Sequence, residues 1–201
     1  MEILKYILVA LASYLIGSVS FSIIVSTLMG GDVRQKGSGN AGATNMARVY
    51  GIVPGVLTWL MDMLKTIVCI WAGTKLLGDW GLTVAGAACI IGHCYPIYYG
   101  FKGGKGVSVG CALALMIDLR VFACVMTVFF LLAFTTKKVS LASISATTSI
   151  LLFGPLFHVG LAKMALACVG VLLIDFRHRE NIKRLINGTE ANFKAAKRVK
   201  E

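Results

Sequence analysis

The chain has 201 residues, of which 57% are hydrophobic and only 14% are charged, and its mean hydropathy is +0.80. A soluble domain carries about 25% charged residues, so this composition excludes a water-soluble globular protein. A net charge of +11 would suit a nucleic-acid-binding protein. The basic residues, however, lie in short stretches between apolar runs, which indicates membrane topology and no nucleic-acid partner.

Apolar runs divide most of the chain into candidate transmembrane helices. The first run is uncharged from Tyr6 to beyond Met29, too long for the apolar region of a signal peptide. Two runs are shorter than the roughly 20 residues that span a bilayer, and Gly154-Pro155 indicates a break between the last two runs. The expected spans are 4–29, 51–77, 80–99, 107–117, 121–136, 141–153 and 158–174.

The basic residues decide the number of spans. With seven spans and the N-terminus outside, most lysines and arginines fall on the cytoplasmic side, as the positive-inside rule requires. Merging either short run with its neighbour would put basic loops on opposite faces of the membrane. We therefore expect an all-α polytopic membrane helix bundle, a single domain over residues 1–201. It has seven transmembrane helices, its N-terminus outside, its C-terminus cytoplasmic and a cytoplasmic tail at 176–201.

The first glycine-rich stretch, residues 36–48, follows the first span. Its glycines match G-x-G-x-x-G, but the dinucleotide fingerprint requires a preceding β-strand, and here a membrane helix precedes it. Small residues let backbone N–H groups approach an anion, and an arginine fork suits phosphate. An ordinary solvated loop is the alternative. The candidate anion-binding residues are Gly37, Ser38, Gly39, Asn40, Gly42, Thr44, Asn45 and Arg48.

A second glycine-rich stretch, residues 100–106, directly precedes an apolar helix. Lysines among glycines at a helix N-terminus predict a phosphate cradle. It is not a Walker P-loop, because Gly106 stands where a Ser or Thr would hold magnesium. A simple topological anchor would need the lysines but not the glycines. The candidate residues are Lys102, Gly103, Gly104, Lys105 and Gly106.

Two further polar groups lie at the same expected face. If the last helix continues, His178 and Asn181 share a side with apolar residues and point back toward the bundle. The alternative is a basic tail that only holds topology. Ser140 and Ser143 stand where a helix re-enters the membrane, where helix capping is the ordinary explanation.

Charged and histidine residues also occur within or beside the apolar runs. Asp62 and Lys65 are spaced i, i+3 inside the second span, which is costly unless they pair or face the interior. Such a pair fits either a transport path or a structural ion pair. His93 and His158 are single histidines beside apolar runs, and packing or interface roles are the expectation for both.

Together these stretches resemble the PlsY family, the bacterial integral membrane acyl-phosphate:glycerol-3-phosphate acyltransferases. Thr66 and Ser108 depart from residues common in that family, and neither is a candidate site residue. The resemblance is carried by Gly17–Phe21, Gly37–Asn45 with Arg48, Asp62–Lys65, Gly92–Pro96 with Phe101–Gly106, Val139–Ile144 and Arg177–Asn181.

The resemblance implies acyl transfer from acyl phosphate to the 1-hydroxyl of glycerol 3-phosphate. It implies a multi-pass protein of the bacterial inner membrane with its active site at the cytoplasmic face. No carboxylate cluster is available to hold magnesium, so we expect neither metal nor cofactor. The substrates and membrane lipid are its partners, along with a soluble enzyme that supplies acyl phosphate. Ser38, Arg48, Lys105 and His178 carry the catalytic roles. Substrate binding is expected of Gly37, Gly39, Asn40, Gly42, Thr44, Asn45, Lys102, Gly103, Gly104, Gly106, Ser143 and Asn181.

Two other functions compete with this one. A small-anion transporter would place its polar residues at mid-membrane, whereas here most lie at one expected interface. An acyltransferase that uses acyl-CoA or acyl carrier protein usually carries H-x-x-x-x-D. None of the three histidines, His93, His158 and His178, has that spacing.

Overall fold

The computed structural model describes residues 1–196, and within them the chain forms helices and no strands. The all-helical prediction is therefore confirmed. The elements are α1 (Glu2–Gly17), α2 (Phe21–Leu28), the 3-10 turn η1 (Val33–Gln35), α3 (Ala43–Tyr50), α4 (Ile52–Cys94), the 3-10 turn η2 (Ile97–Tyr99), α5 (Val107–Ile117), α6 (Leu119–Thr136), α7 (Val139–Leu156), α8 (Leu161–Arg177) and α9 (Arg179–Ile186).

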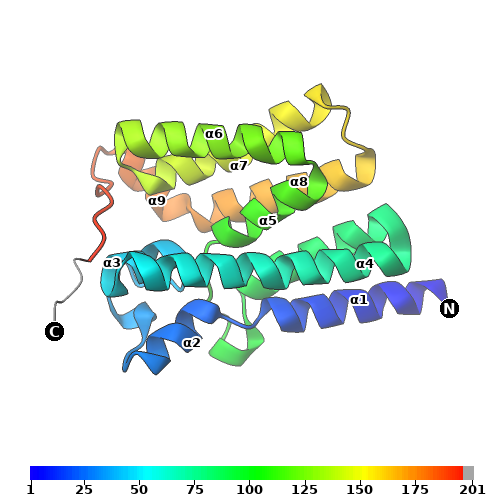
Figure 1. The fold of residues 1–201 in the computed structure, drawn as a ribbon, viewed down its shortest axis with the longest axis horizontal. Coiled ribbons are helices and arrows are strands. Elements are labelled where there is room, and N and C mark those ends of the chain that lie inside the picture. Colours follow the sequence, from blue (N-terminus) through cyan, green and yellow to red (C-terminus); the bar gives the residue numbers. More distant parts are fainter. Residues whose placement is uncertain (197–201) are drawn as a thin grey trace.

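The long helices lie side by side, with α1 to α4 on one side of the bundle and α5 to α8 on the other (Figure 1). α5 packs against α4, α6, α7 and α8, so it lies at the centre. Its Val109, Leu113 and Ile117 are buried in the core. Because α5 is enclosed by other helices, it can be short without exposing its ends to lipid. The chain begins at one end of the bundle, while α3 and α9 lie at the opposite end (Figure 1).

The outer surface of the helices is apolar. Leu8, Phe134, Leu152 and Leu172 are between 55% and 76% exposed. Four helical stretches are long and apolar enough to cross a membrane: Glu2–Leu28, Ile52–Tyr99, Leu119–Thr136 and Val139–Leu156. A surface of this kind is stable in lipid and would be an aggregation site in water.

The first apolar run, expected as one span over 4–29, is broken into α1 and α2. The backbone leaves helical geometry between Ser18 and Ser20 and resumes at Phe21. The break frees the carbonyl of Val19, which accepts a hydrogen bond from Lys65 of α4 at 2.5 Å. A residue 46 positions away in sequence thus contacts the break, which lies in an uncharged segment.

The second and third expected spans, 51–77 and 80–99, form the two halves of α4. Gly78 has a φ of 64°, which a side chain rarely adopts, and the chain reverses there. Gly73 and Gly81 face each other across the reversal, each leaving no room for a Cβ atom. The third span is shorter than expected, because α4 ends at Cys94 and η2 begins at Ile97.

The remaining boundaries differ by a few residues. The expected span 107–117 matches α5, and α6 begins two residues before the expected 121. Instead of 141–153, α7 covers 139–156 and includes Pro155 in its last turn, so the chain leaves the helix after Leu156. The helix at the last expected span, α8, covers 161–177 instead of 158–174, and α9 gives the tail a helix of its own.

Candidate active site

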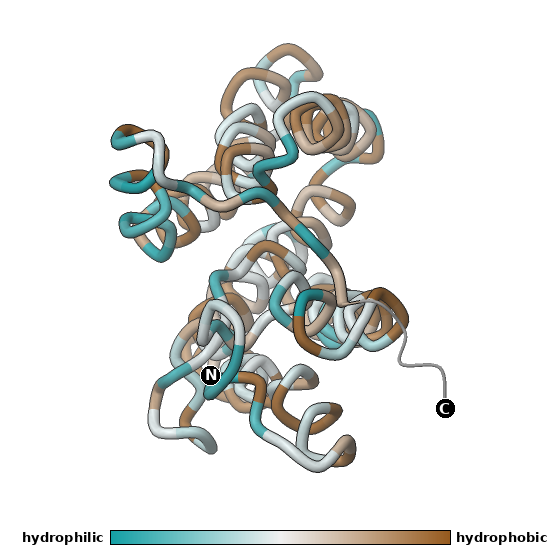
Figure 2. Tube along the Cα trace, turned by 90° about the vertical axis from the view of Figure 1, so that its left-hand side faces the viewer, coloured by the Kyte–Doolittle hydropathy of each residue, from teal (hydrophilic) through white to brown (hydrophobic). Residues whose placement is uncertain are grey.

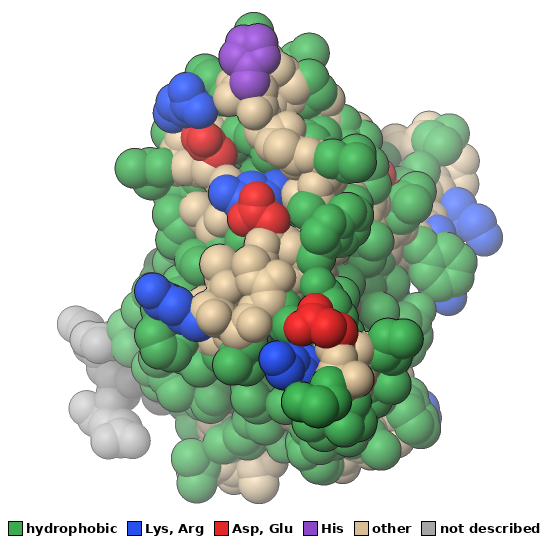
Figure 3. All heavy atoms as spheres, turned by 90° about the vertical axis from the view of Figure 1, so that its right-hand side faces the viewer, with side chains coloured by type: hydrophobic (Ala, Val, Ile, Leu, Met, Phe, Trp, Pro, Cys, Tyr) green, Lys and Arg blue, Asp and Glu red, His purple; other side chains and the backbone are tan. Residues whose placement is uncertain are grey.

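One cavity of about 480 Å³ lies at the end of the bundle that holds α3 and α9. Figure 2 looks onto this end, where hydrophilic stretches occupy α9 and the chain segment that crosses between the helices. Figure 3 looks onto the opposite end, where acidic and basic side chains are interspersed among apolar ones. The sequence-predicted residues that line the cavity are Gly37, Ser38, Asn40, Gly42, Thr44, Asn45, Arg48, Lys105, Gly106, Ser143, His178 and Asn181.

The loop before α3 is organised by Asn45. Its side-chain amide donates to the carbonyls of Val33, Lys36 and Asn40 at 2.9–3.1 Å, and its Oδ1 accepts from the Ser38 N–H at 2.9 Å. These bonds use the whole amide, so Asn45 shapes the loop from inside. The loop then enters α3 at Gly42, and Arg48 lies in the last turn of that helix.

Lys105 reaches the cavity from the loop before α5. Gly106, with a φ of 85°, is the N-cap residue of α5, and no side chain hydrogen-bonds to the first turn of that helix. This turn also lines the cavity. The ammonium of Lys105 donates to Oδ1 of Asn181, on α9. Burial lowers the pKa of Lys105 to about 8, and the charges of Arg184, Arg177 and Arg48 add to that effect.

The cavity is strongly cationic. Within residues 1–196, neither Arg48 nor Lys105 forms an ion pair with a carboxylate. Arg184 also lines the cavity and pairs with Glu190 at 2.7 Å. Three cations thus face one carboxylate, so the site has excess positive charge for anionic ligands.

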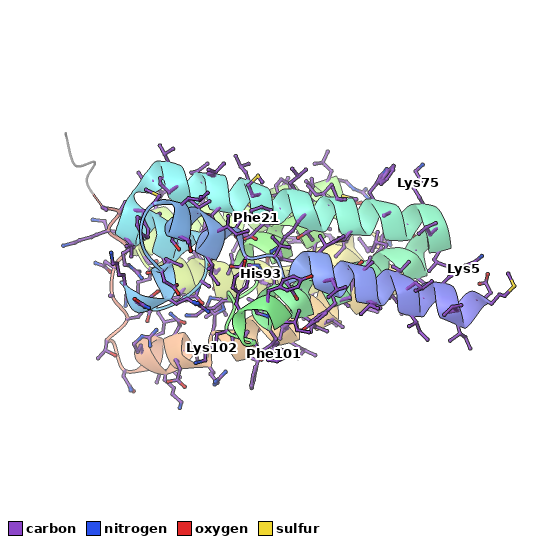
Figure 4. All side chains as sticks on the ribbon, turned by 90° about the horizontal axis from the view of Figure 1, so that it is seen from below. Lys5, Phe21, Lys75, His93, Phe101 and Lys102 are labelled. Carbon is purple, nitrogen blue, oxygen red and sulfur yellow. The ribbon has the colours of Figure 1, made fainter. Side chains whose placement is uncertain are left out.

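Four predicted residues do not line the cavity. Gly39 is exposed, with a φ of 70°. Lys102 is exposed and lies at the rim of the molecule next to Phe101 (Figure 4). The Gly104 N–H donates to the His93 carbonyl at 3.1 Å, and the carbonyls of Gly103 and Gly104 accept from Arg177 at 3.2 Å. This part of the loop is held by protein contacts and positions Lys105.

His178 lies between α8 and α9, buried, with one ring nitrogen facing its own helix. Nδ1 lies 2.8 Å from the Ile174 carbonyl, and since a carbonyl only accepts, Nδ1 carries the hydrogen. In the neutral ring, Nε2 is then an acceptor. Burial lowers the pKa of His178 to about 4, so the ring is neutral near pH 7. The imidazole at the start of the tail therefore lines the cavity.

The serines of α7 do not cap it, because Lys138 is the N-cap residue and no side chain caps the helix. The Ser143 hydroxyl donates to the Val139 carbonyl at 2.8 Å, within its own helix. The Ser140 hydroxyl donates to Oε1 of Glu190 at 2.5 Å. Neither serine therefore caps the helix: Ser140 contacts the C-terminal segment, and Ser143 bonds within α7.

Glu190 is a cavity residue that sequence reasoning missed. Besides Ser140, it accepts a hydrogen bond from Asn181 Nδ2 at 2.7 Å and pairs with Arg184. These bonds lower the pKa of the Glu190 carboxyl although burial opposes them. Glu180, by contrast, is exposed and pairs with Arg179 and Lys183 on the surface of α9.

Residues 187–196, here called the C-terminal strap, run across the mouth of the cavity. The Phe193 N–H donates to the Lys137 carbonyl at 2.8 Å, and the Ala196 N–H donates to the Ala47 carbonyl at 3.2 Å. The strap therefore joins the α6–α7 turn to α3, as the crossing segment in Figure 2 shows. The signal for it in the sequence is Gly188, a glycine directly after α9. Its φ of 70° is one that glycine adopts readily.

A second cavity of about 330 Å³ adjoins the first and is almost wholly apolar. It lies among α4, α5, α6 and α7, and it shares Trp59, Val107, Phe129 and Ser143 with the polar cavity. Apolar residues such as Val56, Val125 and Ile150 form the rest of its wall. The two cavities together make a site that is polar at one end and suited to hydrocarbon at the other.

The sequence model of one family, described as glycerol-3-phosphate acyltransferase, matches residues 7–188. The chain belongs to this family. Proteins named glycerol-3-phosphate acyltransferase from Finegoldia magna and Aquifex aeolicus are 37% and 39% identical to it. The alignments cover 95% and 94% of this chain, and 98% and 100% of those proteins. A third, from Halalkalibacterium halodurans, is 42% identical over 91% of this chain and 93% of its own length.

Two solved structures share the fold. Both are crystal structures of PlsY, an integral membrane glycerol 3-phosphate acyltransferase, one in its glycerol 3-phosphate form and one in its lysophosphatidic acid form. Their TM-scores are 0.90 and 0.89 at 38% and 37% identity, over 94% of this chain and 96% of each of those chains. The resemblance to the PlsY family is confirmed, and the chain is a multi-pass membrane acyltransferase.

Proposed function

We propose that the protein transfers an acyl group from an acyl phosphate to the 1-hydroxyl of glycerol 3-phosphate, yielding lysophosphatidic acid and phosphate. The observation that carries the proposal is the junction of a cationic cavity with an apolar one at Ser143. The cationic cavity suits the phosphates, and the apolar cavity suits a fatty acyl chain. Glycerol 3-phosphate and lysophosphatidic acid, bound in the two PlsY crystal forms, would be its acceptor and product.

The proposed chemistry needs no covalent enzyme intermediate. The hydroxyl oxygen of glycerol 3-phosphate attacks the acyl carbonyl carbon, the bond from that carbon to the phosphate oxygen breaks, and inorganic phosphate leaves. Lys105 and Arg48 would hold the phosphates and stabilise the charge that develops on the leaving group. Ser38, Thr44 and the first turn of α5 would donate further hydrogen bonds, which fix the hydroxyl near the carbonyl.

Two groups compete for the proton of the attacking hydroxyl. His178 presents a free Nε2 acceptor, but its pKa of about 4 makes it a weak base. The second pKa of a phosphate monoester is about 6, so the substrate phosphate is the stronger base. We propose that the phosphate takes the proton, while His178 accepts a hydrogen bond from the substrate and orients it.

The proposed setting is the bacterial inner membrane, with seven spans and the site at the cytoplasmic face. Of the described elements, α3, α9 and the strap gather at the end opposite Met1, which supports this arrangement. A separate soluble enzyme would deliver the acyl phosphate, and the membrane protein itself would need neither metal nor cofactor.

The decisive experiment incubates purified protein with acyl phosphate and labelled glycerol 3-phosphate and assays lysophosphatidic acid. Turnover with acyl phosphate, undiminished by a chelator, is expected. Equal turnover with acyl-CoA or acyl carrier protein in its place would refute the proposed donor. Uptake of glycerol 3-phosphate into liposomes without any product would favour the competing function, transport of a small anion.

A further inference from the structure

A buried cluster of charged and polar side chains lies beside the cavity, and the reaction as proposed above gives it no role. Asp62 and Lys65 lie in the first half of α4 and His93 near the end of its second half, and each is less than 7% exposed. Lys65 Nζ lies 2.7 Å from Asp62 Oδ1, 3.3 Å from His93 Nδ1 and 2.5 Å from the Val19 carbonyl. The reversal at Gly78 brings the two halves of α4 together.

The bonds of Lys65 fix the hydrogen positions on His93. An ammonium has three N–H donors and no acceptor, and Lys65 has three acceptors around it. The Lys65 ammonium cannot accept, so its 3.3 Å contact makes His93 Nδ1 the acceptor, while Asp62 Oδ1 lies farther from Nδ1, at 3.6 Å. In the neutral ring the hydrogen then lies on Nε2. His93 is thus an N–H donor whose orientation is set by Lys65, and through Lys65 by Asp62.

The donor nitrogen faces the phosphate-binding loop. His93 lines the cavity, and a Cβ atom on Gly104 would collide with its Nε2 and with the Ala41 carbonyl. Glycine at 104 therefore keeps the space in front of Nε2 open. Within residues 1–196, Nε2 has no hydrogen-bond partner. Figure 4 shows His93 near the centre of the molecule, whereas Lys102 and Phe101 lie apart from it.

We propose that His93 is a further substrate-binding residue, whose Nε2–H donates a hydrogen bond to a phosphate oxygen held at Lys105. Lys65 and Asp62 act through it as positioning residues. His93 and Lys105 both line the cavity, and Gly104, which lies against Nε2, is joined to Lys105 through one peptide link. A neutral donor suits this place, because a fourth cation would repel Lys105 and lower its charge. The proposal deepens the proposed function and rests on it.

A matched pair of variants separates the two ring nitrogens. His93→Gln places an amide N–H near the position of Nε2, whereas His93→Asn places its amide near Nδ1 and leaves the cavity side empty. His93→Asn is expected to weaken glycerol 3-phosphate binding ~10- to 100-fold, the range for a lost hydrogen bond to a charged group. His93→Gln is expected to restore most of that binding.

The measurement is calorimetric binding of glycerol 3-phosphate to the full chain in detergent, with thermal unfolding as the check on folding. Binding is read without turnover, so the result stands whichever acyl donor the enzyme uses. Parent-like binding in a folded His93→Asn protein would overturn the proposal. Equal loss of binding in the folded Asn and Gln variants would also overturn it, since it would assign His93 a packing role only.

If both variants unfold, Gly104→Ala provides the second test. Its methyl group would occupy the space in front of Nε2 and collide with the ring itself, so the ring would have to move away from that space. A loss of glycerol 3-phosphate binding of tenfold or more is expected in the folded protein. Unchanged binding would mean that no ligand occupies that space and would refute the assignment.

Discussion

At the scale of single residues, the site depends on which side chains are charged near pH 7. Lys105 has a pKa of about 8 and His178 one of about 4, both because burial disfavours the charged form. Near neutrality Lys105 is therefore mostly cationic and His178 is neutral. The cavity presents an ammonium to an anion and an imidazole acceptor to a hydroxyl, which are the two states that the proposed reaction needs.

The pH dependence of kcat/KM for glycerol 3-phosphate should report the free Lys105. Its positive charge is complete well below pH 8 and is lost as the pH rises through that value, so kcat/KM should fall on the alkaline side. In Lys105→Arg the alkaline fall near pH 8 should disappear, because arginine stays protonated. A fall near pH 8 that persists in this variant would assign it to another group.

His178 should contribute no acid limb between pH 5 and 8, as its imidazole gains a proton only near pH 4. His178→Gln keeps a polar side chain but removes the ring acceptor. Weaker glycerol 3-phosphate binding with retained kcat is expected, because the substrate phosphate would still take the proton. A kcat reduced by three orders of magnitude or more, with binding intact, would identify His178 as the base.

Among the helices, close backbone contact holds α1 to α4. A Cβ atom on Gly17 would overlap the Cys89 carbonyl, and one on Gly92 would overlap the Tyr14 carbonyl. Small residues of this kind let membrane helices approach until their backbones touch. This contact keeps Val19 within reach of Lys65 and so holds the interior behind the site.

Gly92→Val should therefore lower the stability of the protein by roughly 1–3 kcal/mol, the usual cost of overpacking a core. The matched control is Gly160→Val, since a Cβ atom at Gly160 meets nothing within 4 Å and its φ of −65° suits any residue. Thermal unfolding in detergent measures both variants. Equal unfolding temperatures in the two would contradict the packing argument.

The C-terminal strap is the other element on which the site depends. Glu190 raises the pKa of Lys105 and holds Asn181 so that its oxygen faces that lysine. In Glu190→Gln, the alkaline fall of kcat/KM should therefore move to lower pH than in the parent. Glu180→Gln, on the exposed side of α9, is the control and should leave the profile unchanged. A shift in the opposite direction would refute this role of Glu190.

For the whole molecule, most of the fold could be predicted because local composition determines it. α5 lies between Gly106 and Asp118, which bound an apolar run in the sequence, and its bounds match the expected span. The break between α1 and α2 could not be predicted, since it is paired with a contact from Lys65. Glu190 was missed for the same reason: its partner Ser140 lies 50 residues away.

The orientation of the bundle is a prediction at this scale. A fluorescent reporter that matures only in the cytoplasm should be active when fused after residue 201, and an alkaline phosphatase active only outside should work when inserted at Gly160. With the N-terminus outside, Gly160 follows six spans and lies outside, whereas the tail follows seven spans and lies in the cytoplasm. The same reporter active at both positions would contradict seven spans with the N-terminus outside.

The shared wall of the two cavities has a further consequence for kinetics. Ser143 and Trp59 line both the apolar cavity, proposed for hydrocarbon, and the cationic cavity, proposed for phosphate. A single amphiphile that carries both a fatty chain and a glycerol phosphate head would occupy both compartments at once. The proposed product is such a molecule, so it should compete with each substrate, and accumulation in the leaflet would slow its own synthesis.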